Sequence, residues 1–431
     1  MVSISLPELP KGKELEEFVS AFFQSNKYYI ERNILRRDVE DVLELDIITT
    51  NYNFSPPEIN LLEIKSGDWG FSDLFKVRGW MDYLNITKGV FITSKERYNI
   101  DFFRKIAKQL NIDLVYFPSL KQSKEALSQF VNNENTEDVD IEAWRFSYWV
   151  ERNLLEQLNH KKKSLKNKKS FKALDEYFFE INNGIFFTDN VAEKVLTLYS
   201  TFQKYPYISA KCGNELIGNN FDDNHKSLPE KIFKETFYGC SFNDIQISTF
   251  IEHRARLAIL KNAIDYKLYK DAGVESKAKG LRSNTILSIS LPDSFKEGLN
   301  SISEHKYSHR YPIFWQWFMW VFGGFILKDY EENEYEILSQ KTGIPISEIP
   351  NAFESYQILF PLSNGWFQDL PNSNIKIMKM FPLPFSGIGA NYRRLLYTSS
   401  AEFKDLNLTG LHTRNDLIKW NNLIIKMLNT R

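Results

Sequence analysis

The stretch VLELDIITTNYNFSPPEINLLEIK, residues 42–65, decides the fold that we predict for the first part of the chain. Its two ends are rich in β-branched and other apolar residues, as strands are, and NYNFSPPE at 51–58 supplies turn-forming residues. We therefore predict strands over 42–50 and 59–65. Asp46 interrupts the apolar run of the first strand, with Glu44 on the same face. A carboxylate in such a run is costly unless a positive group meets it.

The second strand carries two charged residues on one face. Because side chains alternate along a strand, Glu63 and Lys65 point the same way. Their backbone positions are about 7 Å apart, so the tips of the two side chains can converge on one point. If the strands are neighbours, Asp46 and Glu63 can share a divalent cation, with the carbonyl of Ile64 as a further ligand. Mg²⁺ or Mn²⁺ suits such oxygen ligands better than zinc does.

The elements around this pair predict an α/β domain. The apolar spacing indicates a helix over 13–23, and Glu16 on it can reach the same pocket as an outer ligand or a water holder. The complete predicted order is helix 13–23, strands 28–35, 42–50 and 59–65, helix 71–84, strand 89–93, helix 100–110 and strand 113–116. This order predicts a mixed sheet flanked by helices.

A helix with Glu, a strand with Asp and a strand with Glu-x-Lys together resemble the PD-(D/E)XK superfamily, the restriction-endonuclease-like nucleases. GKELEEFV resembles the opening helix of its Mrr-like branch and matches Glu16, ELDII matches Asp46, and LLEIKSG matches Glu63 and Lys65. Leu45 stands where the family motif has proline, a structural position. The resemblance covers about residues 12–116 and implies a metal-dependent phosphodiesterase.

The remainder of the chain predicts a different architecture. We place a nuclease-like domain at 1–125, a linker at 126–140 around the polar NNENTEDVD, and a C-terminal recognition or partner-binding region at 141–431. Helical patterns over 141–158, 244–269 and much of 315–356 predict a mainly helical region, with α+β as the alternative.

Local basic groups must supply any phosphate contacts, because the net charge is only -1. Lys76 and Arg78 follow the catalytic strand and are candidates near the mouth of the site. Lys161, Lys162 and Lys163 begin the run HKKKSLKNKKS, which suits a phosphate backbone, although a solvated loop is the alternative.

Several classes are disfavoured by what the sequence lacks. Two cysteines, Cys212 and Cys240, cannot form a disulfide framework or a four-cysteine zinc site, as expected in a reducing cytoplasm. The apolar run 312–327 is shorter than the ~20 residues of a membrane span, so we predict a buried helix and no membrane partner. No phosphate-binding loop of the NTPase type is present in the sequence.

These observations lead us to expect a cytoplasmic, Mg²⁺- or Mn²⁺-dependent nuclease acting on DNA, with RNA as the alternative substrate. By analogy of architecture, we expect an effector of a microbial defence system, with a short Argonaute protein as a possible partner and homo-oligomers as another form. Two alternatives stay open: a type II-like restriction endonuclease acting as a homodimer, and a degenerate nuclease fold serving as a nucleic-acid-binding scaffold.

Overall fold

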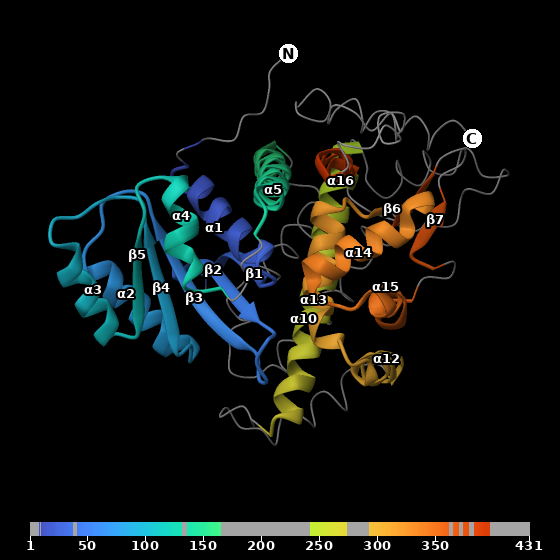
Figure 1. Cartoon of the computed structure of the whole chain (residues 1–431), viewed down its shortest axis with the longest axis horizontal. Helices are drawn as coiled ribbons and strands as arrows, with labels where there is room; N and C mark the ends of the chain where they lie inside the picture. The colour runs from blue at the N-terminus through green and yellow to red at the C-terminus, as the bar shows by residue number, and fades with distance from the viewer. Residues whose placement is uncertain are drawn as a thin grey trace, which may run out of the picture.

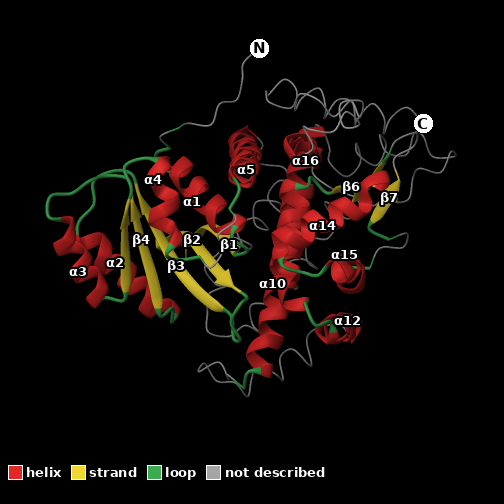
Figure 2. Cartoon of the chain, in the orientation of Figure 1, coloured by secondary structure: helices red, strands yellow, loops and turns green. Residues whose placement is uncertain are grey.

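The structure is a computed structural model, and it describes residues 8, 10–37, 41–131, 136–164, 242–273, 293–361, 365–369, 374–378 and 383–396. Figures 1 and 2 show an N-terminal part that contains a twisted sheet and a C-terminal part that is mainly helical. The predicted α/β part followed by a mainly helical part is therefore confirmed at this level.

The N-terminal part is a five-stranded mixed sheet with helices on both faces. The strands run in the order β1-β2-β3-β4-β5, with β1, β2 and β3 antiparallel and β3, β4 and β5 parallel. Its elements are α1 (Lys13–Ser25), β1 (Tyr29–Arg37), β2 (Asp41–Asn51), β3 (Glu58–Lys65), α2 (Phe71–Leu84), β4 (Lys88–Thr93), α3 (Ile100–Gln109), β5 (Ile112–Tyr116) and α4 (Leu120–Ser128). Every predicted boundary in this part lies within two residues of the observed one.

Close packing assigns the helices to the two faces of the sheet. A Cβ on Gly89 of β4 would lie 2.6 Å from the sulfur of Met81, so α2 lies directly on that face of the strand. On the other face, the rings of Phe18 in α1 and Phe117 after β5 meet at 6.5 Å. The sheet is thus buried on both sides, which explains the continuous apolar runs of its central strands.

The predicted linker, 126–140, includes the end of α4 and the start of α5 (Asp138–Ser164), while residues 132–135 lie outside the described part. α5 packs against α1, so the chain after the linker begins in contact with the N-terminal part. The division into domains stays a prediction.

The C-terminal region combines helices with one small sheet. After α5 come α10 (Phe242–Asp271), α12 (Asp293–Glu304), η4 (Ser308–Arg310), α13 (Tyr311–Gln316), η5 (Trp317–Val321), β6 (Phe325–Leu327), η6 (Lys328–Tyr330), α14 (Glu331–Thr342), η7 (Ile346–Glu348), α15 (Ile349–Leu359), β7 (Phe367–Asp369), β8 (Ile375–Met378) and α16 (Leu383–Leu396). β6, β8 and β7 form an antiparallel sheet in that order.

The apolar run 312–327 is buried as predicted, but only its first part is α-helix. It continues α13 as the π-helix η5 and ends in β6. In the part of the chain that the structure describes, no helix has both the length and the apolar character to span a bilayer.

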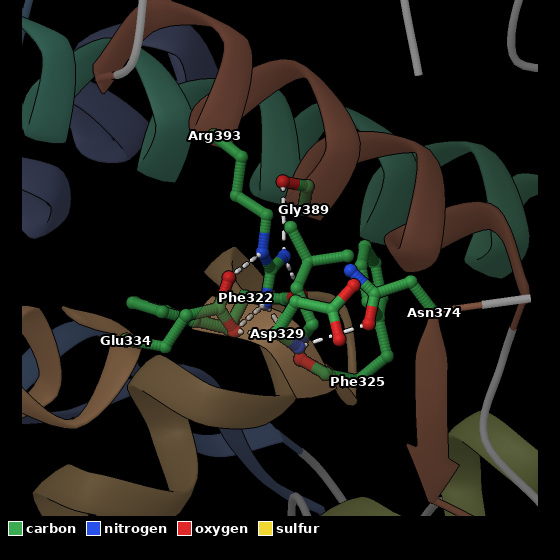
Figure 3. Close-up of polar contacts among 8 residues, drawn as sticks. Phe322, Phe325, Asp329, Glu334, Asn374, Gly389 and Arg393 are labelled. Carbon is green, nitrogen blue, oxygen red and sulfur yellow. Dashed lines mark hydrogen bonds and ion pairs between the residues drawn. The ribbon is translucent and has the colours of Figure 1, made fainter. Parts of the chain in front are cut away.

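A buried ion pair joins three elements of this region (Figure 3). Both carboxylate oxygens of Glu334 in α14 accept hydrogen bonds from Arg393 in α16, and both side chains are essentially inaccessible to solvent. The same guanidinium donates to the carbonyls of Phe322, Gly389 and Phe325 at 2.8, 3.1 and 2.6 Å. With all its donors used, Arg393 links α14 and α16 to the segment between η5 and β6.

A second polar contact closes the edge of the large sheet. β1 is an edge strand, and the side-chain amide of Gln316 pairs with Ile30 as a neighbouring strand would. Gln316 donates to the carbonyl of Ile30 at 2.7 Å and accepts from its N–H at 3.2 Å. Gln24 of α1 also donates to Gln316, at 3.0 Å.

Candidate active site

Asp46 lies where the pairing of β2 becomes irregular. The ladder between β2 and β3 reaches Ile47 opposite Leu62, and the register with β1 omits Asn33, whose φ is 52°. Beyond that point the carboxylate of Asp46 accepts the N–H of Ile64 at 2.8 Å. The side chain therefore replaces a backbone partner and is held beside the end of β3.

Glu63 and Lys65 are brought together as the strand period predicts. The ammonium of Lys65 lies 2.8 Å from Oε1 of Glu63, whose side chain is 2% exposed. The other oxygen of Glu63, Oε2, is buried without a hydrogen-bond partner. A buried carboxylate with one unmatched oxygen favours an additional donor or cation.

Helix α1 brings Glu16 toward the same end of the sheet. The N–H of Gly12, which precedes the helix, donates to Oγ of Ser66 at 2.8 Å, just after the end of β3. Glu16 lies in the first turn of this helix and is half-buried. It influences Asp46 electrostatically, and within the described residues it forms neither a hydrogen bond nor an ion pair with the other three groups.

Two acidic groups of the site, Asp46 and Glu16, have raised pKa values, because of burial and of nearby carboxylates. Burial, followed by the neighbouring charges of Glu63 and Glu16, raises the pKa of Asp46 from its ordinary 3.8 to about 8. Burial also raises the pKa of Glu16, against the lowering effect of Arg32. Although burial alone would lower the pKa of Lys65, its hydrogen bond to Glu63 raises that pKa above the ordinary value. Lys65 is therefore fully charged at neutral pH.

The residues fit a hard divalent cation. N–H and C=O of one strand residue point to the same edge, so the carbonyl of Ile64 points toward Asp46, as its N–H does. Nowhere among the described residues do three His, Cys, Asp or Glu side chains stand close enough to hold a metal by themselves. The donor set is thus two carboxylates and one carbonyl, completed by water, which is a set that Mg²⁺ accepts. A bound cation would give Oε2 of Glu63 a partner and would lower the pKa of Asp46.

Lys76 and Arg78 are engaged elsewhere on α2. The ammonium of Lys76 lies 4.2 Å from the ring centroid of Trp80, and Arg78 pairs with Asp82. Arg78 also donates to the carbonyl of Leu110 at 3.3 Å, near the start of β5 and toward the end of the sheet away from Lys65. The structure does not bring Arg78 to the site.

The three lysines of the basic run end a helix. Residues 161–163 belong to the last turn of α5, and their side chains, like the structure of residues 165–170, lie outside the described part. Their role in nucleic-acid binding stays a prediction.

Arg32 is a charged residue near the site that our sequence-based prediction missed. It lies on β1 with 6% exposure, its guanidinium is 3.9 Å from the ring centroid of Tyr148 in α5, and its charge acts on Glu16. A signal was present in the sequence, because the strand period places Arg32 on the same buried face as Ile30 and Ile34.

The chain matches no protein-family model, no curated protein and no solved structure.

Proposed function

We propose that the N-terminal part is a divalent-metal-dependent nuclease with a restriction-endonuclease-like fold. The observation that carries the proposal is the convergence of Asp46, Glu63 and Lys65, together with the unmatched oxygen of Glu63. Asp46 and Glu63 share one amine, and their mutual repulsion contributes to the raised pKa of Asp46, so the pair favours an added cation. Such a site is explained by a cation that enters with the substrate phosphate.

Each side chain has a role in phosphodiester hydrolysis. Asp46 and Glu63, with the carbonyl of Ile64, bind Mg²⁺ or Mn²⁺, which when bound polarises the phosphate and acidifies a water ligand. Lys65 orients the attacking water or balances negative charge that develops on the phosphate oxygens. Glu16 holds a water in the outer part of the site.

We further propose DNA as the preferred substrate over RNA, with the C-terminal region recognising substrate or partner. The analogy with defence effectors makes a short Argonaute protein or another defence component the partner to test. We also propose that the protein forms homo-oligomers and acts in the cytoplasm.

The test uses the full chain with plasmid DNA, single-stranded DNA and RNA, each with Mg²⁺, Mn²⁺ or EDTA. Asp46→Ala and Lys65→Ala should each lower metal-dependent cleavage by about a hundredfold or more, since each removes a group needed in the transition state. Asp101→Ala is the matched control, because Asp101 is exposed on α3 and, among the described residues, its ion pair is with the neighbouring Arg104. Cleavage that survives either site variant contradicts the assignment.

The pattern of products separates the alternatives. Discrete fragments indicate a type II-like restriction enzyme, and general degradation indicates an effector. A second candidate, the degenerate binding scaffold, is favoured by one observation: Glu63 is already paired with Lys65 in the same strand. Nucleic-acid binding without cleavage, with any metal and any candidate partner, would support the scaffold.

The basic run has its own test. Replacing Lys161, Lys162 and Lys163 by Gln should reduce the slope of log affinity against log salt by up to about 0.9 for each phosphate of duplex DNA that these lysines neutralise. An unchanged slope assigns these lysines to a solvated surface.

A further inference from the structure

A cavity of about 440 Å³ lies in the C-terminal region between α14, α15 and strand β7. Figure 1 places these elements on the side of the C-terminal region that faces away from the five-stranded sheet. The cavity is therefore separate from the proposed active site. Its volume lies in the range that binds small organic molecules or single long side chains.

Four aromatic side chains line it, the buried Trp366 and three rings at its surface. Phe353 of α15 lies 5.3 Å from Phe367 of β7 and 5.8 Å from Tyr335 of α14, measured between ring centroids. The first pair is nearly perpendicular at 87° and the second is tilted by 38°, so the rings face the cavity from different directions. All three are only partly buried, which leaves ring surface accessible. Aromatic faces of this kind attract cations.

Carboxylates at the same cavity reinforce this preference. Glu331 and Glu354 both line it, and in the described part of the chain neither has an ion-pair partner. The hydroxyl of Tyr335 donates to Glu331 and so orients that carboxylate. Lys376 is the only cationic side chain lining the cavity in the described residues, and its ammonium lies 5.7 Å from the ring centroid of Phe367. Two acids and one ammonium leave the cavity with an excess negative charge.

We propose that this cavity binds an organic cation, a guanidinium or ammonium group on an apolar stem. The rings contact the stem and the face of the charged group, and the two carboxylates receive its N–H donors. Lys376 shows that an ammonium is accommodated beside Phe367, and one further cation balances the remaining charge. The group belongs either to a free small molecule or to a basic side chain of a partner protein.

The test compares two probes of matched shape, N-acetyl-arginine amide and its neutral isostere N-acetyl-citrulline amide, by titration calorimetry and ligand-observed NMR with the full chain. The arginine probe should bind saturably in the millimolar range, and the citrulline probe about tenfold more weakly or not at all. Equal binding of the two probes, no saturable binding of the arginine probe, or binding of adenosine in its place overturns the proposal.

Variants locate the site. Glu354→Gln alters an exposed side chain and should weaken binding of the arginine probe about threefold to fivefold, whereas Glu332→Gln, on the exposed surface of α14, should not. Phe367→Leu should weaken binding about tenfold while keeping an apolar side chain. Equal effects of Glu354→Gln and Glu332→Gln would place the binding elsewhere and overturn the assignment.

The source of the cation is then separated by comparing agmatine with the peptide Gly-Gly-Arg-Gly-Gly. Tighter binding of the peptide than of the arginine probe assigns the cavity to a partner's side chain. Tighter binding of agmatine assigns it to a small molecule. Either outcome supports an organic cation as the ligand. In both cases the Glu354→Gln variant must bind agmatine and the peptide more weakly than the wild type does.

Discussion

Asp46 is a residue whose ionisation the fold controls strongly. Its pKa of about 8 arises from burial and from the charges of Glu63 and Glu16. Because this folded-state pKa is raised, the stabilisation from protonated Asp46 is complete below its ordinary pKa of 3.8 and is lost as the pH rises through about 8. A metal ion must displace that proton, so binding and proton release are linked.

We therefore predict that Mn²⁺ affinity rises with pH up to about 8 and then levels off, and that binding near pH 7 releases about one proton. Calorimetry in two buffers of different ionisation enthalpy measures the proton count. Asp46→Asn should abolish the linkage and should make the metal-free protein more stable than wild type at pH 8.5. Asp101→Asn is the control, since Asp101 is exposed on α3. A metal affinity that is flat from pH 6 to 8.5 contradicts the prediction.

At the scale of the elements, α16 lies so close to the end of η5 that only glycine fits at position 389. A Cβ on Gly389 would lie 2.1 Å from the carbonyl oxygen of Phe322, the same oxygen that Arg393 binds. Gly389→Ala should therefore separate the two elements and disturb the pair of Arg393 with Glu334, lowering the free energy of unfolding by about 3 kcal/mol or more. Urea denaturation measures the change. Gly79→Ala is the control, because a Cβ there meets nothing within 4 Å.

The contact of α13 with the edge of β1 gives a second prediction at this scale. Gln316→Ala leaves the N–H and carbonyl of Ile30 and the amide of Gln24 without their partner. Leaving such buried groups unpaired should cost about 2–4 kcal/mol of unfolding free energy. Gln340→Ala, on the exposed surface of α14, should change stability by less than about 0.5 kcal/mol. A decrease smaller than about 1 kcal/mol for Gln316→Ala would mean that water replaces the amide.

Elements of the N-terminal part were predictable because their periodicity is local. The alternation in EINLLEIK was enough to place Glu63 and Lys65 on one face of β3, and the structure has them in contact. β6, β7 and β8 have only three or four residues each, too few for a period to be seen. The strand period places Arg32 on a buried face but does not show its partners, because Tyr148 and Glu151 are more than a hundred residues away.

At the scale of the whole molecule, the two parts meet through buried polar groups as well as apolar side chains. Gln24 of α1 bonds with Tyr148 of α5, and Tyr52, which follows β2, donates to Asp265 of α10 at 2.8 Å. Arg32 and Arg254 both approach Glu151. Polar contacts of this kind require matched partners from both parts, so neither part keeps its native surroundings without the other.

The centre of this interface is Lys261 in α10. Its ammonium lies 2.8 Å from Asp265 on the same helix and 3.3 Å from Glu31 on β1, and its side chain is 5% exposed. Lys261→Met keeps most of the stem but leaves two carboxylates buried without their cation. We expect a decrease of about 3–5 kcal/mol in unfolding free energy, because unpaired buried charges are that costly.

Because Lys261 contacts both parts, the destabilisation should appear in both. Hydrogen exchange should show β2 and β3 losing protection together with α10, and calorimetry of the wild type should show one unfolding transition. Lys267→Met is the matched control on the same helix, where the ammonium makes only a 3.4 Å bond to Asn300 in the described structure. Reduced protection confined to α10 would show instead that the N-terminal part folds independently of the C-terminal region.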